Sequence, residues 1–197
     1  MRFERMSIVC AIIFGTSSLA FAQATVSDVD WNDPSLMMAM GQIEKEKVKG
    51  LESASPYAAS QLPVSLPILG LPLPDKTASV KSLESLASGQ AAALYKYDRN
   101  KGYWYSQLSR GKDITVLVQG SRLSEGDPNP LQPEEISFQF LAEDGSSKPT
   151  EVVASFKRFQ VRYSVTVTCR KVDDPRCSQE AAVRTLISSL KVLGGKQ

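Results

Sequence analysis

The chain has 197 residues, of which 42% are hydrophobic and 22% are charged, and its formal net charge is +2. This length and balance suit one folded domain with its own core, and so small a positive charge argues against a dedicated nucleic-acid binder. The sequence contains no histidine, which excludes Ser-His-Asp and Cys-His catalysis and argues against a transition-metal site. It also contains no Gly-rich phosphate-binding motif. We therefore expect neither a cofactor nor a metal.

Residues 1–22 have the pattern of a signal peptide. Arg2 and Arg5 precede an apolar run that ends in the small-x-small sequence Ala20-Phe21-Ala22. This pattern predicts cleavage after Ala22 and a periplasmic or secreted protein with no transmembrane segment after cleavage. The alternative is an uncleaved membrane anchor, for which the apolar run is at or below the length that spans a bilayer.

Residues 23–76 are predicted to contain a helix followed by a proline-rich extended segment. Asp33 suits the cap of a helix over about 35–52, and Pro34 suits its first turn. The narrow apolar stripe of this helix consists of Leu36, Met40, Ile43, Lys47 and Leu51. Such a stripe can dock the helix on the domain or on a partner.

The proline-rich segment, residues 53–76, contains five of the eleven prolines. Its central part, residues 62–74, carries no charge. Proline excludes a helix or a central strand, so we expect an edge strand or an extended cover lying over the core. The alternative is a proline-rich segment that docks on a partner protein.

Residues 77–197 are predicted to form an α+β domain with a mostly antiparallel sheet of five to six strands and helices packed on one face, a two-layer sandwich. A short helix is expected over 77–88. Alternation of apolar and polar residues predicts strands at 94–97, 103–105, 113–120, 136–140, 152–156 and 161–169. The apolar positions change from even to odd numbers between Lys157 and Gln160, which predicts a hairpin turn or a bulge there.

The sequence around Asn100 predicts a β-hairpin, because Asn100 and Gly102 both tolerate positive φ. A turn centred on Asn100 places Tyr97 opposite Tyr103, and it places Tyr95 opposite Tyr105.

A final helix is predicted to begin at a Ser178 cap and to end at Gly194-Gly195. Its apolar stripe consists of Val183, Leu186, Ile187, Leu190 and Leu193.

Cys169 and Cys177 are the two cysteines that remain if the signal peptide, with Cys10, is removed. An even and closely spaced pair in an oxidising compartment predicts a disulfide bond. The alternative is a redox-active pair, which normally has the shorter C-x-x-C spacing.

The candidate binding residues lie in two basic segments of the predicted sheet. Residues 91–122 and 152–176 each carry a net charge of +4, whereas residues 123–151 carry −6. If the basic segments share a face, Lys157 and Arg162 join the hairpin in a basic and aromatic surface for an acidic glycan, a phospholipid head group or an acidic protein face. The residues selected for this surface are Tyr97, Arg99, Lys101, Tyr103, Trp104 and Arg158. The alternative is that these are solvent-facing strand residues that protect sheet edges from aggregation.

Three functions are compatible with these patterns. The first is a non-catalytic periplasmic binding or assembly accessory protein, whose partner is an envelope protein or an anionic envelope polymer. The second is an envelope hydrolase that uses carboxylates from the group Glu125, Asp127, Glu134 and Glu135. The third is a structural subunit with residues 35–52 and 62–74 as docking arms. No motif supports catalysis, and no spacing identifies a Ser–Lys nucleophile.

The segment F-K-R-F-Q-V-R-Y-S-V-T-V-T-C, residues 156–169, is followed by D-P-R-C at residues 174–177. This combination resembles a pattern in uncharacterised exported proteins of proteobacteria, and the likeness extends over the chain from about Gly102 onward. The resemblance implies a periplasmic location and a disulfide bond. It implies no activity and no functional residue.

Overall fold

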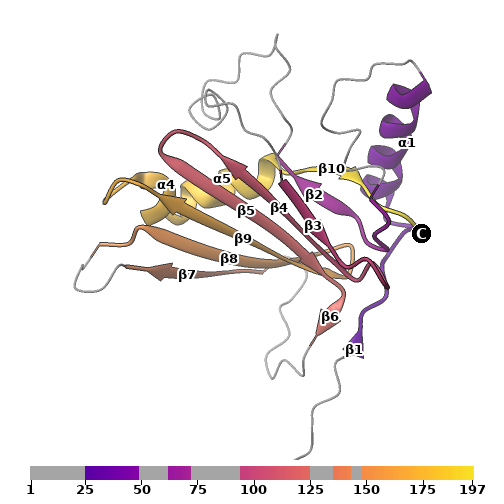
Figure 1. Cartoon of the computed structure of the whole chain (residues 1–197), viewed down its shortest axis with the longest axis horizontal. Helices are drawn as coiled ribbons and strands as arrows, with labels where there is room; N and C mark the ends of the chain where they lie inside the picture. Colours follow the sequence, from indigo (N-terminus) through magenta and orange to yellow (C-terminus); the bar gives the residue numbers. More distant parts are fainter. Residues whose placement is uncertain (1–24, 49–61, 72–93, 125–134, 143–147) are drawn as a thin grey trace, which may run out of the picture.

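The computed structural model describes residues 25–48, 62–71, 94–124, 135–142 and 148–197 (Figure 1). A six-stranded antiparallel sheet, with strand order β3-β4-β5-β9-β8-β7, forms its centre. The strands are β3 (Leu94–Tyr97), β4 (Trp104–Arg110), β5 (Ile114–Ser121), β7 (Ile136–Leu141), β8 (Glu151–Arg158) and β9 (Val161–Cys169). Every predicted strand is present, and the α+β class is confirmed.

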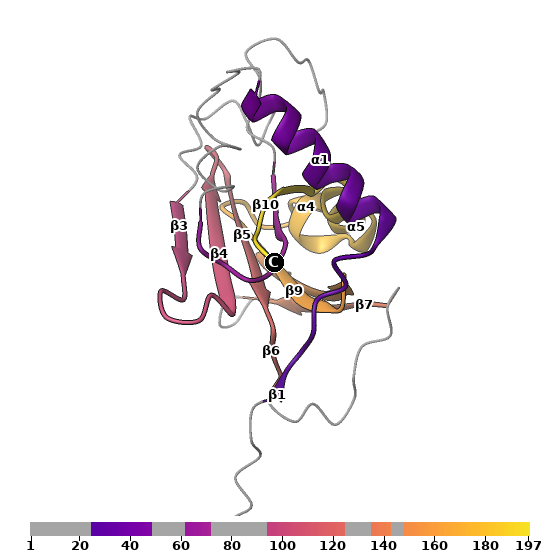
Figure 2. The ribbon, with the colours of Figure 1, turned by 90° about the vertical axis from the view of Figure 1, so that its right-hand side faces the viewer.

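One face of this sheet is covered by helices and by a second, two-stranded sheet (Figures 1 and 2). The covering elements are β2 (Ile68–Gly70), α4 (Pro175–Ser178), α5 (Glu180–Ser189) and β10 (Lys191–Gly194). Strand β10 pairs antiparallel with β2, and α1 (Pro34–Val48) packs against β10. A third small sheet joins β1 (Thr25–Val26) to β6 (Leu123–Ser124). None of the helices in the described residues is long and apolar enough to cross a membrane.

Alternating side chains of the central strands form the core, as the period of two predicts. The even positions of β5 and the odd positions of β9 are buried, as are the even positions of β8 except Arg158 at its end. Arg158 lies opposite Val161, so Phe159 and Gln160 alone form the β8–β9 turn, both with positive φ (53° and 62°). This two-residue hairpin explains the predicted change of apolar phase.

The described part of the proline-rich segment, residues 62–71, is an extended cover over the core. Residues 66–71 are all buried. The Tyr105 hydroxyl donates to the Leu69 carbonyl (2.8 Å) and accepts from the Leu69 N–H (2.7 Å). The Tyr163 hydroxyl donates to the Pro67 carbonyl (2.8 Å). Residues 66–71 therefore belong to the core of the sheet, which agrees with the predicted extended cover.

Gly120 makes this arrangement possible, because it lies between Tyr105 and Tyr163 in one row across the sheet. A Cβ atom at this position would lie 2.4 Å from the Tyr105 ring and 3.0 Å from the Tyr163 ring. The missing side chain leaves room for both phenol groups to reach the covering segment.

Helix α1 begins as predicted, because the Asp33 carboxylate accepts hydrogen bonds from the N–H groups of Ser35 (2.9 Å) and Leu36 (3.1 Å). Leu36 is completely buried, whereas Met37 and Met38 are 59% and 67% exposed. The predicted end of this helix, including Leu51, lies outside the described residues. The helix predicted over 77–88 also lies outside them.

The predicted register of the β3–β4 hairpin is wrong. Tyr97 lies opposite Tyr105, and Tyr95 lies opposite Gln107. The connection is a six-residue loop, 98–103, because Asp98 organises a wider turn. Its carboxylate accepts from the Asn100 N–H (2.9 Å), and its own N–H donates to the Trp104 carbonyl (3.0 Å).

The C-terminal helix ends four residues earlier than predicted, and the predicted Ser178 cap is wrong. Helix α5 ends at Ser189, and the chain then forms β10, which supplies backbone hydrogen-bonding groups to β2. The Asp174 carboxylate caps α4, whereas the Ser178 hydroxyl donates back to the Asp174 carbonyl (3.0 Å). The five predicted stripe residues are nevertheless all buried.

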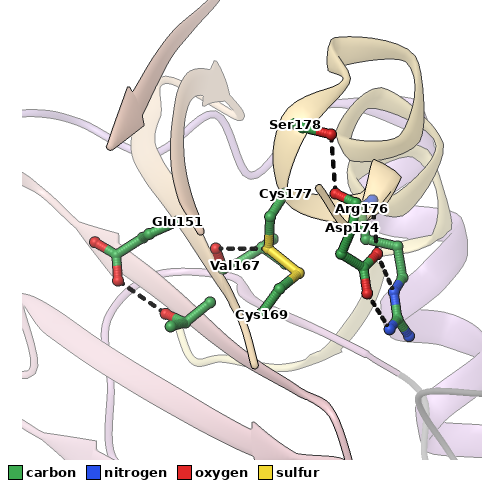
Figure 3. The surroundings of a disulfide bond; sticks show 8 residues. Glu151, Val167, Cys169, Asp174, Arg176, Cys177 and Ser178 are labelled. Atoms are coloured by element: carbon green, nitrogen blue, oxygen red, sulfur yellow. Dashed lines mark hydrogen bonds and ion pairs between the residues drawn. A yellow bond between two sulfur atoms is a disulfide. The ribbon is translucent and has the colours of Figure 1, made fainter. Parts of the chain in front are cut away.

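The predicted cysteine pair is joined, with the two sulfur atoms 2.02 Å apart (Figure 3). This bond ties the end of β9 to α4. Beside it, the Asp174 carboxylate accepts hydrogen bonds from the Arg176 guanidinium at 2.8 and 2.6 Å. This contact with Arg176 holds the pKa of Asp174 below its ordinary value.

Candidate binding surface

The predicted binding residues gather at one end of the central sheet, where the β3–β4 loop and the β8–β9 turn lie (Figure 1). At this end, strand pairing places Trp104 beside Ser121, Ser121 beside Arg162, and Arg162 beside Lys157. Paired residues of antiparallel strands face the same side of a sheet, so these four side chains form one row. With strands about 4.8 Å apart, the row runs about 14 Å from Trp104 to Lys157.

The helices cover one face of the central sheet (Figure 2), and this row lies on the other face. Its neighbours in sequence, Tyr105 and Val161, point into the core, so the side chains of the row point outward. Trp104 is 38% exposed, and Arg162 and Lys157 are half-buried by their strand neighbours. The next row toward the centre of the sheet contains small polar residues, namely Ser106, Gln119, Ser164 and Ser155. We name the two rows together the outer polar face.

Tyr103 lies just before this face and is held between two cations. The Lys101 ammonium is 5.8 Å from the centre of its ring, and the Arg122 guanidinium is 5.4 Å from it. Arg122 is itself fixed, because its Nε donates to the Ser27 carbonyl (2.8 Å) and its Nη1 to the Ser65 carbonyl (3.2 Å). Arg122 therefore links three distant segments and orients the Tyr103 ring.

Arg158 lies at the other side of this sheet end, as the last residue of β8 before the β8–β9 turn. Its exposed guanidinium is 4.9 Å from the centre of the Phe159 ring, which is buried. The Phe159 carbonyl accepts a hydrogen bond from the Asp30 N–H (3.1 Å), which fixes the turn against the N-terminal segment. The pKa of Asp33 is lowered, mainly by a hydrogen bond from Ser35 and in small part by the charge of Arg158.

The six selected residues do not form one cluster. Arg99 and Lys101 are exposed on the hairpin loop beside Tyr103 and Trp104, whereas Arg158 is separated from them by β5 and β9. Tyr97 faces the core side of the sheet and packs partly buried against the core. The surface that the structure brings together therefore contains Trp104, Arg162 and Lys157, flanked by Lys101.

Arg122 is the residue that sequence reasoning missed. Its role depends on contacts with Ser27 and Ser65, which are 95 and 57 residues away in the chain. No local pattern around an arginine at a strand end signals such contacts.

A shallow depression of about 340 Å³ lies between β7, β8 and the end of α5. Its lining contains the apolar residues Ile136, Phe156 and Ile187 and the charged residues Glu135, Lys157 and Arg158. Glu135 is the one predicted catalytic carboxylate that is described, and it is exposed. Glu125, Asp127 and Glu134 lie outside the described residues. Within the described ranges, no group of three Cys, Asp or Glu side chains is placed to hold a metal ion.

Comparison of the chain with known proteins gives no matching family model, no matching curated protein and no matching solved structure.

Proposed function

We propose that this protein is an exported, non-catalytic binding domain that holds an anionic polymer of the cell envelope on its outer polar face. The observation that supports this function most directly is the row of Trp104, Arg162 and Lys157 on the face of the sheet opposite the helices. The exposed indole ring is suited to stack on a sugar or an acyl group, and the two cations farther along the same row are suited to pair with a carboxylate or phosphate of the same ligand.

The shape and polarity of the face favour a polymer over a small molecule. The face is built on paired strands, and its inner row, with Ser106, Gln119, Ser164 and Ser155, offers hydroxyl and amide groups to a neighbouring chain. An extended polymer can contact both rows at once, so that several weak contacts add together. An acidic face of an envelope protein is the alternative partner, with the same charge requirement.

The cations at this face come from the two basic segments of the sequence, 91–122 and 152–176. Arg162 and Lys157 lie opposite one another on β9 and β8, and Lys101 lies at the loop before β4. Cations that lie side by side on a sheet make the local potential more positive. This potential favours an anionic ligand that lies across the row.

The experiment that tests the proposal places a photo-reactive residue at Gln119, which is exposed and lies in the inner row of the outer polar face. The protein is irradiated in its native host, and the adduct is identified by mass spectrometry. A glycan or lipid-linked polymer adduct is expected, and its yield should fall when Trp104→Ala or Lys157→Glu is added. Lys171→Glu is the matched control, because Lys171 is exposed at the opposite end of β9.

A discrete protein adduct would show that the partner is an envelope protein rather than a polymer, and that this domain is an assembly subunit. No adduct from an exported and folded protein, or a yield that Lys171→Glu lowers as much as Lys157→Glu, would refute binding at this face. If Trp104→Ala lowers the melting temperature as well as the adduct yield, Trp104 is part of the core instead.

A second candidate function is that of a structural subunit docked through α1. The observation that favours it is the exposure of Met37 and Met38, which adapt readily to an apolar partner surface. Replacing both methionines by lysine should abolish such docking while leaving the Trp104-dependent adduct unchanged.

A further inference from the structure

We propose that the edge strand β7 pairs with β7 of a second copy of this chain, so that the central sheet continues antiparallel across a two-fold axis. This inference is independent of the proposed ligand, because the outer polar face and β7 are different parts of the sheet.

Strand β7 is an edge strand of the central sheet. Among the described residues it pairs only with β8, and it lies at the outside of the sheet (Figure 1). Its sequence, I-S-F-Q-F-L, contains no charge, no proline and no glycine. These are the residues by which natural proteins keep edge strands from adding further strands. The opposite edge, β3, carries the exposed Lys96.

The side chains of β7 are also incompletely covered. Phe138 is partly buried against the core, whereas Phe140 is 37% exposed and Leu141 is 36% exposed. The two phenylalanine rings stack along the strand, with centroids 6.4 Å apart. An added strand would cover these rings from the open side and continue the core beyond the present edge.

The sequence of β7 is self-complementary in an antiparallel arrangement. With the two-fold axis at Phe138, Ile136 meets Phe140 of the second copy, and Ser137 meets Gln139 of the second copy. Apolar side chains then face each other on the core side, and polar side chains face each other on the outer side. An axis at Gln139 would instead set Ser137 against Leu141. The first register therefore matches residues 136–140 on both faces, with Leu141 opposite Glu135 beyond them, and gives the isologous contact of a two-fold dimer.

The charges next to β7 are compatible with this contact. The Arg184 guanidinium of α5 lies 4.8 Å from the centre of the Phe138 ring, so two copies of Arg184 would approach the axis. Each is accompanied by the Glu180 carboxylate at 3.5 Å. The two copies therefore meet with paired charges, and a Glu180 of one copy can also pair with an Arg184 of the other.

The first test is sedimentation equilibrium of the purified protein with its disulfide intact, over a wide range of concentration. A reversible dimer is expected. Phe140→Lys should raise the dissociation constant of the dimer at least about tenfold, because it places a charge in the contact and removes an apolar anchor. Gln139→Lys should weaken the dimer, whereas Gln119→Lys, the same change in the middle of the sheet, should leave it unchanged. Circular dichroism confirms that each variant is folded.

The second test fixes the register by oxidative cross-linking. The double variant Ser137→Cys/Gln139→Cys should form a covalent dimer, because the pairing places each cysteine opposite one of the other copy. A monomer at every concentration, a dimer unaffected by Phe140→Lys, or a folded double variant without a cross-link would each overturn the proposal. A monomer that instead adds a foreign extended peptide to β7 would also overturn it.

Discussion

We expect the hydroxyl group of Tyr105 to contribute more to the free energy of unfolding than most other polar groups in the core. It satisfies both backbone groups of Leu69, through hydrogen bonds of 2.8 and 2.7 Å, and all three groups are buried. Tyr105→Phe removes one oxygen atom and leaves a buried N–H and a buried C=O without this partner. Tyr163→Phe is the matched control, because its hydroxyl bonds to the Pro67 carbonyl alone.

The magnitude follows from the number of backbone groups that lose a partner. An unsatisfied buried group costs about 1–3 kcal/mol. Tyr105→Phe affects one N–H, at about 1–3 kcal/mol, and one carbonyl, at about 1–2 kcal/mol, so it should lower the free energy of unfolding by about 2–5 kcal/mol. Tyr163→Phe should lower it by about 1–2 kcal/mol, because a carbonyl oxygen retains a second acceptor site. A change of 1 kcal/mol shifts the melting temperature by about 2–4 °C in a domain of this size.

Urea unfolding monitored by circular dichroism, with the disulfide intact, measures both variants under one set of conditions. The m-value, which is the slope of the unfolding free energy against urea concentration, must be the same for all variants. It scales with the surface exposed on unfolding, so equal m-values allow a direct comparison. A Tyr105→Phe variant within about 0.5 kcal/mol of the original protein would refute the reasoning. It would show that β10 and apolar burial hold the covering segment without the phenol. An equal loss in both variants would show that the number of satisfied groups does not decide the cost.

Three further predictions concern the disulfide, the α1 cap and the effect of pH. Cys177→Ser should lower the free energy of unfolding by about 2–3 kcal/mol, the chain-entropy cost of opening so short a loop, and added reductant should have no further effect on this variant in urea unfolding. Asp33→Ala should lower it by about 1 kcal/mol at neutral pH. Because the pKa of this capping carboxyl is lowered in the folded state, the cap stabilises above about pH 4, and the difference between variant and original should vanish as the pH falls further. Burial raises the pKa of the Tyr163 phenol well above its ordinary value, so the unfolded chain releases this proton first. Stability should be complete below about pH 10 and fall above it, and the fall should be smaller in Tyr163→Phe, as thermal melts across this range would show.

The parts of the fold that the sequence predicts well are those decided by neighbouring residues. The central strands follow the alternation of apolar side chains, and the β8–β9 turn follows from the phase change at Phe159 and Gln160. The Asp33 cap and the disulfide also depend on residues that lie close together in the chain. In each case a local rule and the global fold agree.

The predictions that fail depend on partners far away in the chain. Leu190 and Leu193 fit the stripe of α5, but β2 needs a backbone partner, and this tertiary demand turns the last residues into β10. The composition of the candidate surface also depends on strands that are far apart in the chain. Strand order places Arg162 and Lys157 in line with Trp104, and it places Tyr97 on the core side. Neither the strand order nor the pairing register can be read from residue type alone.

The pairing of β2 with β10 sets an order of events during folding. The two strands are separated by 120 residues, 71–190, and the segment that contains β2 has no other strand partner among the described residues. A chain that emerges with its N-terminus first must therefore keep the apolar sequence of residues 62–71 unpaired until its last strand arrives. Its prolines slow any premature strand pairing by removing backbone donors. Closure of this long loop should be the slow, late step of folding, after the β8–β9 hairpin has formed.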